Sequence, residues 1–248
     1  MEVFSQSDVV RNFMTHSSLN SEIDKRTICS SDDIPMLEFY KNLFNSVFVS
    51  LNPFLRIKET SKFTTDDFWN DEIENEEKTK VIENTNPIKW SEILFLSKLE
   101  NINQIDIALR TGILGLKKEF ENKDYLKELN RILEQNNMLS PSEGCIEEIQ
   151  QNGILNAIAK LGYSTICIGT EFGDLIETRN ISELIDSGTS IYGKNLYTED
   201  KNILISVHWD SFQTYICSTK QNVERIVKEA NLEGFYCGEK TEIYWSLK

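Results

Sequence analysis

The chain has 248 residues with 40 acidic and 26 basic side chains, which gives a formal net charge of −14 when both histidines are neutral. Its content of 40% hydrophobic and 27% charged residues is that of a folded globular protein and excludes disorder over the whole length. The negative charge repels phosphate backbones and anionic lipid head groups, so we expect no nucleic-acid partner and no membrane partner.

Two further features of the sequence predict a cytoplasmic protein. No segment approaches the roughly 20 apolar residues that cross a bilayer, and residues 1–18 lack the basic-then-apolar order of a signal peptide. The five cysteines are odd in number, widely spaced and without a C-x-x-C pair. We therefore expect reduced thiols that pack as small apolar side chains, at Cys29, Cys145, Cys167, Cys217 and Cys237.

The chain begins with residues 1–35, which carry few large apolar side chains and predict an N-terminal extension before a single domain over residues 36–248. Apolar residues at helical spacing predict a helix over residues 36–48, which ends before Asn52-Pro53 because proline blocks continuation. The residues that give this pattern are Leu37, Tyr40, Leu43, Phe44 and Phe48.

A strongly acidic segment follows. Eight acids and two lysines lie between Asp66 and Glu83, so the net charge of these 18 residues is −6. Like charges at this density favour a solvated loop or an exposed helix, and their spacing does not fit a calcium-binding loop. The functional alternative is a docking surface for a basic protein partner. That surface would consist of Asp66, Asp67, Asp71, Glu72, Glu74, Glu76 and Glu77.

The middle of the chain predicts four helices. Apolar spacing places them over residues 90–101, 105–120, 126–133 and 146–161. The second has the clearest pattern, yet Gly112 and Gly115 lie within it and would weaken it. Glycines at these positions indicate that another backbone approaches closely.

The last third of the chain predicts most of the strands. Residues 164–168 form a buried strand that enters a glycine-containing loop, and residues 203–217 form a hairpin in which Val207 faces Thr214 and Leu204 pairs with Cys217. A helix over 220–230 and strands over 234–237 and 242–245 follow. The expected fold class is α+β, with a helical N-terminal half (36–162) packed on a mainly antiparallel sheet from the C-terminal third (163–248).

Six short segments carry a family resemblance. They are Leu51-Asn52-Pro53-Phe54, Pro87-Ile88-Lys89-Trp90, residues 108–120, Ser140-Pro141-Ser142-Glu143, Val207-His208-Trp209-Asp210-Ser211 and Ile243-Tyr244-Trp245. In this order they resemble a bacterial family of uncharacterised proteins, domain-of-unknown-function family 2711. The resemblance implies a single cytoplasmic domain from a Gram-positive bacterium, and it brings no established reaction, ligand or catalytic residue.

The sequence contains none of the common signatures of nucleotide-binding proteins, zinc proteases or esterases. With only two histidines, we expect no metal site and no cofactor. His208 near Asp210 is the first catalytic candidate, because an imidazole and a carboxylate can share a proton; a hydrogen-bonded strand residue is the alternative. Cys217 lies about four residues further along the predicted ladder, too far away to join them.

Paired carboxylates are the second candidate for acid-base chemistry. Glu171 and Asp174 lie at a loop that follows a strand, where ligand sites often form. Glu147 and Glu148 are adjacent in a predicted helix and would diverge by about 100°, which makes them the weaker pair.

The sequence favours a binding function over catalysis. We expect an acidic protein that acts through a protein–protein surface, such as an immunity, antitoxin or anti-defence inhibitor of a basic enzyme, because an acidic face speeds and orients docking onto a basic site. One alternative is an enzyme with Glu171, Asp174 and His208 around one pocket. The other is a regulator that binds a small ligand. The oligomeric state stays open.

Overall fold

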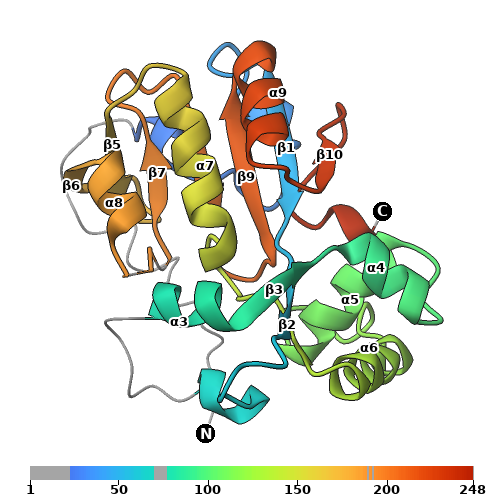
Figure 1. Cartoon of the computed structure of the whole chain (residues 1–248). Coiled ribbons are helices and arrows are strands. Elements are labelled where there is room, and N and C mark those ends of the chain that lie inside the picture. Colours follow the sequence, from blue (N-terminus) through green and yellow to red (C-terminus); the bar gives the residue numbers. More distant parts are fainter. Residues whose placement is uncertain (1–22, 70–76, 189, 192, 248) are drawn as a thin grey trace, which may run out of the picture.

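A seven-stranded antiparallel sheet forms the centre of the molecule (Figure 1). The computed structural model describes residues 23–69, 77–188, 190–191 and 193–247. Within them the strands lie in the order β10-β1-β9-β8-β7-β5-β6. Their bounds are Ser46–Leu51 (β1), Thr165–Gly169 (β5), Leu175–Asn180 (β6), Asn195–Tyr197 (β7), Leu204–Val207 (β8), Gln213–Ser218 (β9) and Gly234–Tyr236 (β10).

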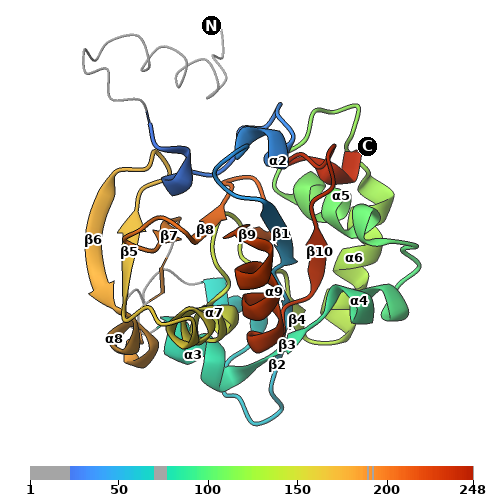
Figure 2. The same cartoon turned by 90° about the horizontal axis from the view of Figure 1, so that it is seen from above.

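Both faces of this sheet are covered. One face packs against the helices α7 (Glu148–Lys160), α8 (Ile181–Asp186) and α9 (Lys220–Glu229), as Figure 2 shows. The N-terminal segment with η1 (Lys25–Thr27) and α2 (Met36–Phe39) lies on the opposite face. The central strands are therefore buried on both sides, which favours apolar residues at successive positions along them.

A helical lobe lies beside the large sheet. It consists of α4 (Trp90–Leu96), α5 (Ile102–Gly112) and α6 (Lys123–Gln135), and its core is centred on the buried Trp90, Ile105 and Leu129. A three-stranded sheet in the order β3-β2-β4 lies between this lobe and α3 (Glu77–Asn84). The bounds of the remaining elements are Phe54–Ile57 (β2), Thr85–Ile88 (β3), Met138–Leu139 (β4), Thr65–Trp69 (η2) and Trp245–Leu247 (η3).

Several predicted elements are confirmed. The helices expected in the regions of α4, α6, α7 and α9 are present, as are the strands at β5 and β10 and the hairpin of β8 and β9. Val207 pairs with Thr214 and Leu204 with Cys217, as the predicted register requires. The α+β class is confirmed. The expected division into a helical half and a C-terminal sheet is only partly confirmed, because strands occur along the whole described chain.

The helix predicted over residues 36–48 is wrong after its first turn. α2 ends at Phe39, Asn42 takes a left-handed φ of 64°, and the chain then enters β1 between β9 and β10. Phe48 pairs with Ile216 on one side and with Tyr236 on the other. A strand buried on both faces has a continuous apolar sequence, and such a short run does not differ in periodicity from a buried helix.

The helix predicted over residues 105–120 is also too long. α5 ends at Gly112, and the Gly115 N–H donates to Arg110 O (2.9 Å) while the Leu114 N–H donates to Thr111 O (3.3 Å). This is the Schellman arrangement, with Leu114 at φ 60° in the left-handed position. The strand predicted over 242–245 is wrong as well: side-chain bonds, including one from Arg110 to Ile243 O (3.2 Å), hold that segment in place of a strand partner.

Candidate functional site

His208, the first catalytic candidate, is fully hydrogen-bonded. It follows β8, and its Nδ1 accepts a hydrogen bond from the Asp210 backbone N–H (3.3 Å). Its Nε2 lies 2.7 Å from Asp32 Oδ1, so we place the ring proton on Nε2. A general base needs a free nitrogen, and neither nitrogen of His208 is free in this arrangement. The contact instead attaches the segment around Asp32 to the hairpin turn.

A buried ion pair also holds the β8–β9 turn in place. Arg110 and Asp106 are both 0% exposed and are joined by Nε and Oδ2 at 2.9 Å. Arg110 also donates to Asp210 O (2.5 Å), and its guanidinium lies 4.6 Å from the centre of the Tyr244 ring. Ser246 Oγ donates to Asp106 Oδ2 (2.6 Å). These bonds join α5, the β8–β9 turn and the C-terminal segment, and they satisfy both charges.

The other catalytic candidates lie elsewhere. Glu171 and Asp174 are exposed on the loop between β5 and β6, and His208 lines neither the pocket at the C-terminal segment nor the pocket that contains Asp174. The Asp210 carboxylate accepts from the Tyr244 hydroxyl (3.4 Å). Burial, followed by the charges of Asp32 and Asp210, raises the pKa of Tyr244 to about 12.

The five cysteines are free thiols, in agreement with the sequence prediction. Burial raises the pKa of Cys29, Cys145 and Cys237 to about 12 and that of Cys217 well above its ordinary value. The thiolate is the reactive form of cysteine, so these four side chains are poor nucleophiles at neutral pH.

Glu147 and Glu148, the weaker carboxyl pair in the sequence, are both buried in the structure. Glu147 and Glu148 are 0% and 1% exposed at the start of α7. The Ser142 N–H donates to Glu147 Oε2 (2.8 Å), and Ser190 Oγ donates to Glu148 Oε1 (2.9 Å). Burial, followed by the charge of Glu148, raises the pKa of Glu147 well above its ordinary value. Glu147 Oε1 has no hydrogen-bond donor among the described residues, and a proton shared with Glu148 satisfies it.

The expected divergence of these two carboxyls does not occur because Glu147 precedes the helix. It is the N-cap residue, with φ −56° and ψ 130°, so the rotation of about 100° per helical residue does not apply between it and Glu148. The signal in the sequence is that the two acids stand between two isoleucines, Ile146 and Ile149.

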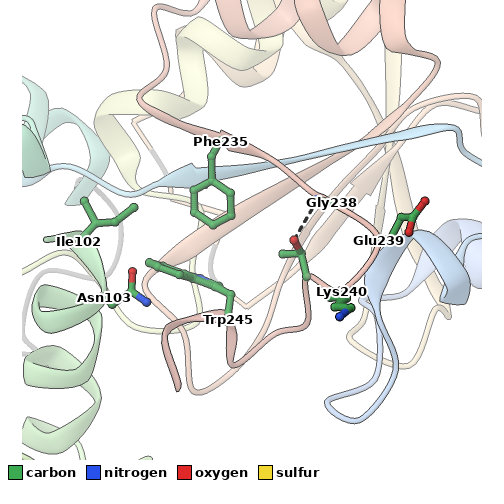
Figure 3. Close-up of a pocket in the computed structure, with 8 residues that line it drawn as sticks. Ile102, Asn103, Phe235, Gly238, Glu239, Lys240 and Trp245 are labelled. Carbon is green, nitrogen blue, oxygen red and sulfur yellow. Dashed lines mark hydrogen bonds between the residues drawn. The ribbon is translucent and has the colours of Figure 1, made fainter. Parts of the chain in front are cut away.

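An open pocket lies at the C-terminal segment (Figure 3). Its volume is about 620 Å³, and the Phe235 and Trp245 rings meet edge to face at 4.9 Å in its wall. Asn103 lies at one end, and Glu239 and Lys240 lie at the other (Figure 3). The wall is therefore aromatic, with its charged groups at one rim.

A second pocket, which we call the edge groove, lies beside β6. Its volume is about 510 Å³. The β5–β6 ladder shifts register between Ile168, which pairs with Glu177, and Gly169, which pairs with Leu175. This bulge leaves Ile176 as the extra residue and turns Leu175 to the same face as Thr178. The groove is lined by Ile23, Asp24, Thr27, Cys167, Phe172, Gly173, Asp174, Leu175, Thr178, Tyr197, Glu199 and Lys201.

Most of the predicted acidic docking segment lies outside the described residues. This applies to Asp71, Glu72, Glu74 and Glu76, and nothing is described of the side chains of Asp66 and Glu77. The Asp67 carboxylate accepts from the Thr64 N–H (2.6 Å) and hydroxyl (2.8 Å), which lowers the pKa of Asp67.

The two lysines of that acidic segment are withdrawn from the surface. Lys78 Nζ donates to Leu184 O (2.6 Å) at the end of α8, and burial lowers the pKa of this amine. Lys80 Nζ donates to Asp67 O and lies 4.8 Å from the centre of the Phe63 ring. These partners are backbone carbonyls, and no ion pair joins either lysine to an acid whose side chain the structure describes.

No group of three or more histidine, cysteine, aspartate or glutamate side chains has a metal-binding arrangement within residues 23–69, 77–188, 190–191 and 193–247. No helix in that part of the chain has the length and apolar character needed to span a bilayer.

These features define an acidic α+β protein built on a seven-stranded antiparallel sheet, with an exposed edge strand and an adjoining groove. The chain belongs to the family described as "Protein of unknown function (DUF2711)", whose family model matches residues 32–247. The resemblance found in the sequence is thereby confirmed. No curated protein and no solved structure matches the chain.

Proposed function

We propose that the protein acts by binding another protein, and that its docking surface is the edge strand β6 with the acidic side chains around it. The observation that carries this proposal is the position of β6 at the edge of the large sheet and the exposure of its residues. β6 is the last strand of the large sheet among the described residues, and none of its six residues is buried. An exposed strand edge offers unpaired N–H and C=O groups to an extended segment of a partner.

The surface of β6 is apolar where it joins the preceding loop. Phe172, Leu175 and Ile176 are 55%, 57% and 48% exposed. Single exposed apolar residues are common on protein surfaces, but three within five residues form a contiguous patch. Such a patch supplies the apolar centre of a small interface.

The surroundings of this patch are acidic. Residues 170–186 contain five acids and one arginine, a net charge of −4. α3, which ends the acidic segment 66–83, contacts α8 through Lys78. Two acidic stretches that lie far apart in the sequence therefore approach the same side of the molecule. A basic partner is favoured because its charge speeds association and fixes its orientation.

We favour an inhibitor of a basic enzyme, of the immunity, antitoxin or anti-defence kind, as the version of this function to test first. An acidic protein that adds a strand to its target blocks a basic surface without catalytic residues of its own. This version also fits His208, whose two ring nitrogens are both occupied.

Selection from a displayed library of short peptides tests the proposal, with the purified full chain as bait. We expect the selected peptides to be rich in lysine and arginine alternating with apolar residues, and their binding to weaken as salt rises. Ile176→Lys should abolish capture, because it adds a positive charge to the edge of β6. Leu43→Lys, at a leucine that is 41% exposed outside β6, is the matched control and should leave capture unchanged. Neutral or acidic peptides, or equal capture by Ile176→Lys, would refute the proposal.

A further inference from the structure

The edge groove has the features of a site for a positively charged side chain. It lies against β6, so a residue of a strand added to that edge is within reach of it. We propose that the edge groove binds a lysine or arginine side chain of the partner and so anchors the partner's strand. This inference rests on the proposed function for its partner, but the chemistry of the groove can be tested separately.

The first argument is an unused polar group. The Tyr197 side chain is 4% exposed and lines the groove, and its hydroxyl has no hydrogen-bond partner among the described residues. Asp24 and Asp174 line the same groove as this phenol. This hydroxyl is open to the groove, where it can accept a hydrogen bond from an ammonium or guanidinium group of a ligand.

The second argument is uncompensated negative charge. Asp24 is already paired, with Arg26 at 2.8 Å and Lys201 at 2.9 Å. No cation is paired with Asp174 or Glu199 among the described residues, and the carboxylate of Glu199 accepts only from the Thr165 hydroxyl (2.8 Å). A cationic side chain beside Asp174 would complete the charge balance of the groove.

The third argument is shape. The groove of about 510 Å³ has the size of a ligand pocket, and its walls include the rings of Phe172 and Tyr197. Aromatic rings attract cations and also pack against the methylene groups of lysine and arginine. The bulge at Ile176 is what turns Leu175 into this wall, so the backbone irregularity of β6 shapes the groove.

Small capped amino acids test the groove without requiring strand addition. We would titrate the full chain with Nα-acetyl-lysine N-methylamide and with its norleucine counterpart, and follow binding by NMR. The lysine compound should bind with shifts at Tyr197 and Asp174, and the norleucine compound should bind at least about tenfold more weakly. Asp174→Asn and Tyr197→Phe should each weaken lysine binding about fivefold. Glu183→Gln, on α8 outside the groove, is the control and should leave it unchanged.

Each outcome of this titration has a distinct meaning. Equal binding of the two compounds, or no binding of either, would overturn the anchor site. Strand addition at β6 is tested separately, by peptide capture with the Ile176→Lys variant. Lysine binding that is insensitive to both Asp174→Asn and Tyr197→Phe would also overturn it. Loss of the hydroxyl in Tyr197→Phe should not unfold the protein, because that hydroxyl bonds no described residue; a thermal melt of each variant confirms that the fold is intact.

Discussion

Replacing Glu147 by glutamine should stabilise the protein near neutral pH. The side chain is 0% exposed, and the carboxyl it faces, Glu148, is 1% exposed. Burial and the charge of Glu148 raise the pKa of Glu147 above the value of 4.5 that glutamate has in an unfolded chain. Folding above pH 4.5 therefore requires uptake of a proton that the unfolded chain has lost.

The size of this effect follows from the proton count. The stabilising contribution of protonated Glu147 is complete below pH 4.5, and it declines as pH rises toward the pKa in the folded state. One proton corresponds to about 1.4 kcal/mol per pH unit, so stability falls at about that rate between pH 4.5 and the pKa of Glu147 in the folded state. In Glu147→Gln, the amide can donate to Glu148 in place of the shared proton and accept from the Ser142 N–H, with no titration.

Urea unfolding from pH 4 to pH 7 measures the prediction. The free energy of unfolding of Glu147→Gln should match that of the wild type near pH 4 and exceed it by a margin that grows with pH. Glu119→Gln, at an exposed residue after α5, controls for the removal of one negative charge. A difference that does not change with pH, or a variant that is less stable at pH 7, would refute the shared proton.

Three further predictions concern the helical lobe. Arg110→Met should lower the free energy of unfolding by about 3–5 kcal/mol because it leaves Asp106 charged and buried, and the double variant with Asp106→Asn should recover much of this loss; urea unfolding that shows additive losses would contradict the pairing. Leu114→Gly should raise the free energy of unfolding by up to about 1 kcal/mol, because an exposed leucine at φ 60° is strained. The melting temperature should rise with it, and a lower melting temperature would argue against strain. Arg131 lowers the pKa of Glu128 to about 2, so Glu128→Gln should cost less than about 1 kcal/mol above pH 4.5 and nothing near pH 2; a cost that persists in acid would disprove this linkage.

Local patterns predicted the elements that have one exposed face. α6 and α9 alternate between buried and exposed sides, and their helical periods are visible in the sequence. The register of β8 and β9 could be predicted because a short connection, residues 208–212, joins the two strands and limits how they can align.

The missed elements are those whose surroundings come from distant parts of the chain. β1 is buried on both faces by α9 on one side and by the N-terminal segment on the other. β6 has no buried residue at all, so it shows no hydrophobic period. In both cases the period that distinguishes a strand from a helix is absent from the sequence.

The candidate sites show the same division. His208 was found because histidine is rare in this chain, but its partner Asp32 could not be predicted, since the contact joins the N-terminal segment to a hairpin turn late in the chain. No pattern in the sequence marked Tyr197 as a functional residue. It becomes a candidate only because the fold places it in the same groove as Asp174, with its hydroxyl open to that groove.

The sequence by itself determined the net charge, the reduced cysteines, the α+β class and the family, because these depend on composition and on local or ordered segments. Only the tertiary structure decided that β6 is an exposed edge, that Glu147 and Glu148 share a buried site, and that the lysines of the acidic segment bond uncharged groups. Each of these features depends on which distant residues exclude water from a side chain. That exclusion sets the free-energy cost of a charged side chain at the site and decides whether a surface is exposed to a partner.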